Sequence, residues 1–146
     1  MICLVGLASA DPAIADWQYT KWGMSQEQAI SASKGEARRV RSGDDVQCNH
    51  GDKPFGIIER KKIGNFDFKV SFGADKTTGK LTSVRLDYQG NVFMLQRALL
   101  GQYGKPLRQD RQEMLWRDDK AGNLFLLYTI METAAIMDYR SSQTGL

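Results

Sequence analysis

Residues 91–106, NVFMLQRALLGQYGKP, are the stretch that decides the fold. Its apolar side chains recur at the spacing of one helical face, namely Val92, Leu95, Leu99 and Tyr103. Asn91 is a favoured N-cap, Gly104 suits the left-handed residue that follows a helix, and Pro106 prevents continuation. The stretch therefore predicts an amphipathic helix. Because strand patterns precede and follow it, we expect a sheet to pack on this helix.

Strand patterns lie on both sides of the predicted helix. FDFKVSFG at 66–73 and LTSVRLDY at 81–88 alternate apolar and polar residues, which is typical of strands with one wet face. FGIIERKK at 55–62 predicts a further strand, and the charges of RRVR at 38–41 suit an edge strand. After the helix the predicted strands are QEMLWR, NLFLLYTIM and AIMDYR, at 112–117, 123–131 and 135–140.

A shorter helix is predicted at residues 26–34, where Ser25 and Gln28 form a capping box and Gly35 can end the helix. The expected fold class is thus α+β: an antiparallel meander sheet with two helices packed on one face, in the order helix, three or four strands, helix, three strands. The side chains expected to be buried together are Phe68, Val70, Phe72, Val84, Leu86, Leu95, Leu99 and Tyr103.

The first residues have the pattern of a signal peptide. An apolar run at 2–8 is followed by Ala13-Ile14-Ala15, which predicts cleavage before Asp16. The first fifteen residues lack Lys and Arg, so the basic region of such a signal is truncated or degraded; a disordered cytoplasmic tail is the alternative. The apolar run is too short to span a membrane. We therefore expect residues 1–15 to be a signal peptide, residues 16–146 to be one domain, and the protein to be periplasmic or secreted.

Composition excludes several classes of function. With 146 residues, 42% of them hydrophobic and 25% charged, the chain can form one globular core. A net charge of +3 is far below that of a dedicated nucleic-acid binder, so no nucleic-acid partner is expected. The sequence contains no phosphate-binding glycine motif, serine-nucleophile motif or zinc-protease motif. We expect no cofactor and no enzymatic activity.

The one cluster of chemically reactive residue types lies in the loop from Asp44 to Asp52. Cys48 and His50, with Asp45 beside them, could bind a divalent metal or form an imidazole-activated thiolate. A single Cys-x-His pair is weak for a structural zinc site, and acidic loops near glycine are commonly solvated turns. A small-ligand or metal-binding protein is thus the second hypothesis for function, and an enzyme of unknown class is the third.

The first hypothesis is a non-catalytic binding module. One face of an antiparallel sheet can be offered to a protein or a cell-envelope component. Aromatic residues near the N-terminus could form a ligand platform or close the core. Trp116 would belong to an apolar interface patch if it is exposed and to the core if it is buried, and burial is favoured. The candidate partner-binding residues are Lys69, Arg85, Trp116, Trp17, Tyr19 and Trp22. The oligomeric state is left open.

Three stretches also carry a resemblance to a known group. WGMSQEQA at 22–29, FKVSFGADKTTGKLTSVRL at 68–86 and LLGQYGKP at 99–106 precede a Trp and a final β-hairpin. This layout resembles small secreted proteobacterial proteins and is similar to the helix-plus-meander domains of the β-lactamase-inhibitor-protein and outer-membrane-assembly lipoprotein group. The resemblance implies an α+β binding domain and brings no catalytic residue. The chain lacks the lipidation cysteine of the assembly lipoproteins.

Overall fold

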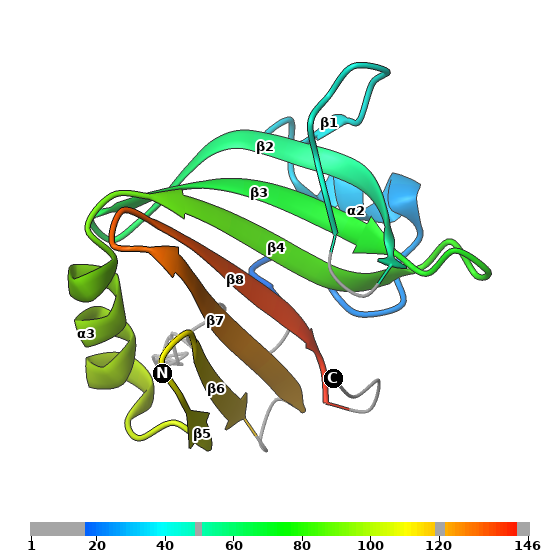
Figure 1. The fold of residues 1–146 in the computed structure, drawn as a ribbon. Coiled ribbons are helices and arrows are strands. Elements are labelled where there is room, and N and C mark those ends of the chain that lie inside the picture. The colour runs from blue at the N-terminus through cyan, green and yellow to red at the C-terminus, as the bar shows by residue number, and fades with distance from the viewer. Residues whose placement is uncertain (1–16, 49–50, 119–121, 143–146) are drawn as a thin grey trace, which may run out of the picture.

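One antiparallel sheet of eight strands carries the fold (Figure 1). The computed structural model describes residues 17–48, 51–118 and 122–142. The strands are β1 (Arg38–Arg39), β2 (Lys53–Ile63), β3 (Phe66–Ala74), β4 (Leu81–Gln89), β5 (Arg108–Gln109), β6 (Glu113–Asp118), β7 (Asn123–Met131) and β8 (Ala134–Ser141). The two helices are α2 (Gln26–Ala32) and α3 (Val92–Tyr103). The order of the strands in the sheet is β1-β2-β3-β4-β8-β7-β6-β5.

The sheet consists of two four-stranded meanders that meet at β4 and β8. Along this seam Val84 pairs with Tyr139, Leu86 with Met137 and Tyr88 with Ala135, so apolar residues of both halves share the inner face. Cross-strand pairs of this kind are what stabilises a sheet. The two meanders therefore form one continuous sheet with one core.

The expected layout of helices and strands is wrong. Four strands follow α3 rather than three, because the two-residue strand β5 has no alternation that a sequence pattern can reveal. The helices have 7 and 12 residues and lie near opposite ends of the long sheet (Figure 1), so they cover only its two ends. Aromatic and aliphatic side chains of the sheet, together with Trp17, fill the core between them.

The predicted core is confirmed at seven of its eight positions. Side chains from β3, β4 and α3 are almost completely buried in one cluster with residues of β6, β7 and β8, whereas Tyr103 is half-buried against it. Trp116, Phe125 and Tyr139 stack in series, with ring centroids 4.8 and 5.2 Å apart. The final strands thus complete the core that β3 and β4 begin.

The helix ends follow the predicted signals. Asn91 accepts a hydrogen bond from the Met94 N–H at 3.1 Å, and Gly104, with φ of 75°, ends α3. Ser25 and Gln28 form the expected capping box, although α2 ends at Ala32, two residues earlier than predicted. Neither helix in the described part of the chain combines the length and apolar character that crossing a bilayer requires.

The segment that follows β1 crosses the outer face of the sheet, where Figure 1 shows it running over β2 and β3. The Asp45 carbonyl accepts a hydrogen bond from Lys69 at 3.1 Å, and an added Cβ on Gly73 would lie 2.9 Å from the Cys48 sulfur. This covering explains why Ser71, expected on a solvated face, is only 1% exposed.

Candidate functional site

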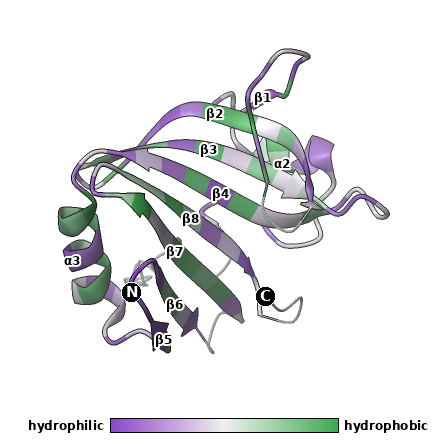
Figure 2. Cartoon of the chain, viewed as in Figure 1, coloured by the Kyte–Doolittle hydropathy of each residue, from purple (hydrophilic) through white to green (hydrophobic). Residues whose placement is uncertain are grey.

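The exposed apolar side chains of the described residues gather around α3. Those with large side chains all lie on α3, on the loop after it, or at the end of β7, and Figure 2 shows hydrophobic residues along most of α3. We call this set the α3 surface; it comprises Phe93, Met94, Leu100, Leu107, Ile130 and Met131. Phe93 and Met131 are 61% and 56% exposed, so more than half of the surface of each residue is in contact with water. Exposed apolar residues gathered in one region are typical of an interaction surface.

A groove of about 760 Å³ lies between the start of α3 and the β7–β8 turn. Phe93 and Gln96 line it from the helix, Ile130 and Met131 from the end of β7, and Arg111 from the segment before β6. The α3 surface therefore includes a concave part, as interfaces that bind a protruding side chain do.

Backbone contacts hold the two walls of this groove in place. The Val92 N–H donates to the Glu132 carbonyl at 3.1 Å, and the Gly90 N–H donates to the Thr133 carbonyl at 2.9 Å. Gln96 also reaches the Thr129 hydroxyl at 3.2 Å. The groove is thus preorganised, which lowers the entropy lost when a partner binds.

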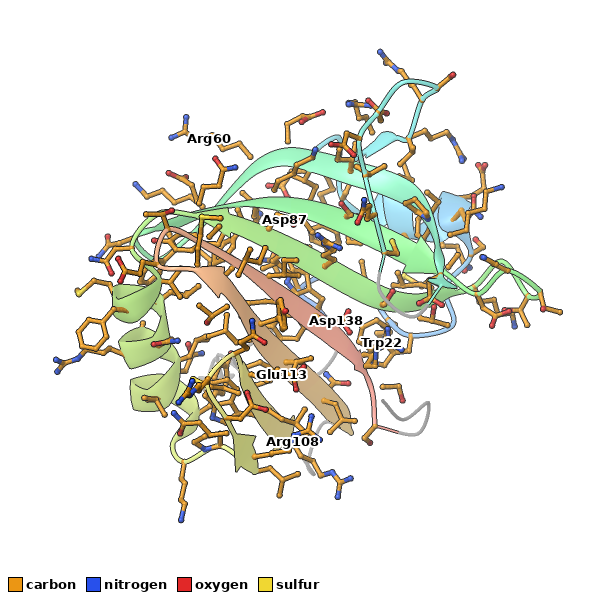
Figure 3. The ribbon with its side chains drawn as sticks, in the orientation of Figure 1. Trp22, Arg60, Asp87, Arg108, Glu113 and Asp138 are labelled. Atoms are coloured by element: carbon orange, nitrogen blue, oxygen red, sulfur yellow. The ribbon has the colours of Figure 1, made fainter. Side chains whose placement is uncertain are left out.

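Arginines accompany the apolar residues. The Arg97 guanidinium lies 5.7 Å from the centroid of the Phe93 ring, at cation–π distance. Arg108 at the sheet edge pairs with Glu113 at 3.3 Å, and Figure 3 labels both residues. Aromatic residues, Met and Arg are the types enriched at protein interfaces, so the composition of the α3 surface fits a protein partner.

A buried polar cluster lies on the outer face of β3, β4 and β8. Asp52 accepts hydrogen bonds from the Ser83 hydroxyl at 2.7 Å and the Thr82 hydroxyl at 2.8 Å, and Arg140 Nε donates to Asp138 at 3.0 Å. Arg140 Nη2 lies 3.9 Å from Asp52 as well. The pairing of these residues ties the covering segment to the sheet. Two buried polar atoms on this face, Arg140 Nη2 and the Ser71 hydroxyl, make no hydrogen bond to a described residue.

Cys48 borders this cluster as a thiol. Burial, and then the negative charge of Asp52, raises the pKa of Cys48 to about 12 from its usual 9.0. A thiolate, rather than a thiol, is the nucleophile and metal ligand. The environment thus disfavours the activated-thiolate hypothesis for this loop.

The acidic residues of the proposed metal-binding loop do not lie together in the structure. Asp45 is exposed, and Asp44 turns to Arg38, whose guanidinium donates to both carboxylate oxygens at 2.9 Å. That pairing holds the pKa of Asp44 far below its usual range. His50 lies outside the described residues, and within the described ranges no three His, Cys, Asp or Glu side chains are grouped to hold a metal ion.

The predicted partner-binding residues do not form one surface. Trp17 and Trp116 are 1% and 3% exposed and belong to the core. The half-buried Trp22 donates its indole N–H to Asn123 at 2.7 Å, and Figure 3 labels Trp22 beside the end of β8. Tyr19 packs edge-on against Trp17.

The two charged candidates lie on the outer face of the sheet. Arg85 pairs with Asp87 at 2.9 Å and exposes only 14% of its side chain, while Lys69 is bound to the covering segment. Neither is a freely accessible charge on a flat face.

Sequence reasoning did not find the α3 surface. The available signal was the second set of apolar residues in the 91–106 stretch, at Phe93, Met94 and Leu100, which do not fit the buried stripe. Comparison of the chain with protein families, with curated proteins and with solved structures found no match.

Proposed function

We propose that this protein is a non-catalytic binding module whose partner is another protein or a cell-envelope component. The observation that carries the proposal is the α3 surface, which holds all the large exposed apolar side chains of the described residues. Three of them, Phe93, Ile130 and Met131, line a preformed groove. Monomeric proteins rarely expose such a group of residues without a use for it.

The energetic centre of this interface is expected at Phe93 and Ile130, which line the groove from α3 and from β7. Aromatic residues and well-packed anchors dominate interface energetics, and truncation of such a residue typically weakens binding by at least about 2 kcal/mol, roughly 30-fold in Kd. Arg97, stacked on Phe93, adds a charge that suits an acidic partner.

The test uses the full chain as bait with envelope extract. Phe93→Asp and Ile130→Asp each place a charge in the groove, and Thr77→Asp places one in the β3–β4 turn, away from the α3 surface. We expect the wild type and Thr77→Asp to retain the same specific protein and both groove variants to lose it. Equal retention by all four proteins, or retention of nothing specific by the wild type, would contradict the proposal.

We also propose that the protein works in the periplasm or outside the cell, on the basis of the Ala13-Ile14-Ala15 pattern. N-terminal sequencing of the protein from its natural host should then begin at Asp16. Recovery of an intact Met1 from the cytoplasm would argue against export.

A further inference from the structure

A cavity of about 250 Å³ lies between α3 and the inner face of the sheet. Leu95 and Leu99 line it from α3, Phe68 and Leu86 from the sheet, and Trp17 from the segment before α2. It lies on the flank of α3 away from the groove of the α3 surface, because its lining includes the β2–β3 turn and not the β7–β8 turn. The cavity is thus a separate feature of the molecule.

This cavity is open to solvent on one side, because Gly64, Ala98 and Gln102 of its lining are exposed. Concave sites with mostly apolar walls are the usual form of a small-molecule pocket. An apolar cavity of about 150 Å³ is enough to bind benzene in an engineered protein, so about 250 Å³ suits a molecule of roughly two fused rings. The wall is mainly aromatic and aliphatic, which selects an uncharged ligand.

One residue that lines the cavity carries a buried polar atom without a partner. Trp17 is 1% exposed, and its indole N–H makes no hydrogen bond to any described residue. The other two tryptophans contrast with it: Trp22 donates to Asn123 at 2.7 Å and Trp116 donates to the Gly104 carbonyl at 3.0 Å. A buried donor without an acceptor is costly, and an acceptor atom on a ligand would remove that cost.

The Trp17 ring is held rigidly where it lines the cavity. It packs edge-on against Phe72 at 5.7 Å and Tyr19 at 5.9 Å between centroids, and the Thr20 hydroxyl donates to its carbonyl at 2.7 Å. At the rim, Ala98 is a small, exposed residue of α3, which leaves room for a ligand to enter. The cavity is therefore preformed and accessible to a ligand.

We propose that this cavity binds a compact, uncharged, two-ring apolar molecule that carries one hydrogen-bond acceptor, with the Trp17 indole as the donor. This inference is independent of the protein-binding function of the α3 surface.

The experiment compares two ligands of the same shape by NMR titration of the full chain labelled with ¹⁵N. 2-Acetylnaphthalene carries a carbonyl acceptor, and 2-isopropylnaphthalene does not. We expect both to bind and the ketone to bind on the order of five to ten times more tightly, as one net hydrogen bond allows. The Trp17 indole resonance should move downfield with the ketone alone.

Three variants test where the ligand binds and which group it contacts. Ala98→Phe adds a ring at the rim and should weaken both ligands at least about tenfold, whereas Gly101→Phe adds the same ring on the same helix where nothing lies within 4 Å, and should leave binding unchanged. Trp17→Phe should abolish the preference for the ketone while the hydrocarbon still binds. Absence of saturable binding to the wild type, equal effects of the two α3 variants, or a ketone preference that survives Trp17→Phe would each overturn the proposal.

Discussion

Gly73 shows how closely the outer face of the sheet is packed. A Cβ at this position would lie 2.4 Å from the Ser83 hydroxyl and 2.9 Å from the Cys48 sulfur, whereas a Cβ on Gly101 of α3 would meet nothing within 4 Å. Gly73→Ala should therefore reduce the free energy of unfolding by about 1–3 kcal/mol through overpacking. Gly101→Ala should raise it by about 0.5–1 kcal/mol through helix propensity. Urea unfolding measures both, and a Gly73→Ala protein as stable as wild type would contradict the close contact.

Cys48 provides a second prediction at this scale. With its pKa raised to about 12, the thiol should stay protonated at pH 8. In a Cys3→Ala variant, the remaining thiol should react with Ellman's reagent at least about 100-fold more slowly than a small free thiol, because the thiolate is the reactive form. Unfolding in urea should restore ordinary reactivity, and rapid reaction of the folded protein would contradict the burial.

The raised pKa of Cys48 also predicts how the free energy of unfolding depends on pH. The folded state binds the Cys48 proton more tightly than the unfolded state, so this contribution to stability is complete below about pH 9 and is lost as the pH rises toward 12.

The helix α3 divides its residues between core and surface at adjacent positions. Leu99 is 6% exposed and belongs to the core, whereas Leu100 is 38% exposed on the α3 surface. Leu99→Ala should cost about 2–5 kcal/mol of unfolding free energy. Leu100→Ala should cost much less, and a similar loss from both variants would show that the helix does not face the sheet as described.

At this scale the sequence predicted well where a local pattern exists. The caps of α3 and the alternation of β3 are short-range signals. The structure confirms both caps, whereas the alternation of β3 ends at Val70 because Ser71 is buried as well. The two-residue strand β5 has no period to detect, so the layout of the second half was wrong. The α3 surface was missed because helical periodicity identifies the buried stripe and does not tell which other apolar side chains stay in water.

In the whole molecule, stability should be greatest at the seam between β4 and β8. These strands lie at the centre of the sheet and share apolar pairs across it, whereas β1 and β5 are short edges. Native-state hydrogen exchange should give β4 and β8 the slowest amides, which exchange only by global unfolding, and β1 and β5 the fastest. If β5–β8 exchanged together before β1–β4, the two meanders would be separate cooperative units.

The sequence by itself determined the longer elements, because capping, alternation and helical spacing act between residues that are close along the chain. It fixed α3, the long strands and nearly all of the core side chains expected from them. Only the tertiary structure decided that β4 pairs with β8, that the segment after β1 buries Ser71, and that Trp17 faces a cavity. These features depend on contacts between residues far apart along the chain, whose positions follow from packing and leave no local pattern.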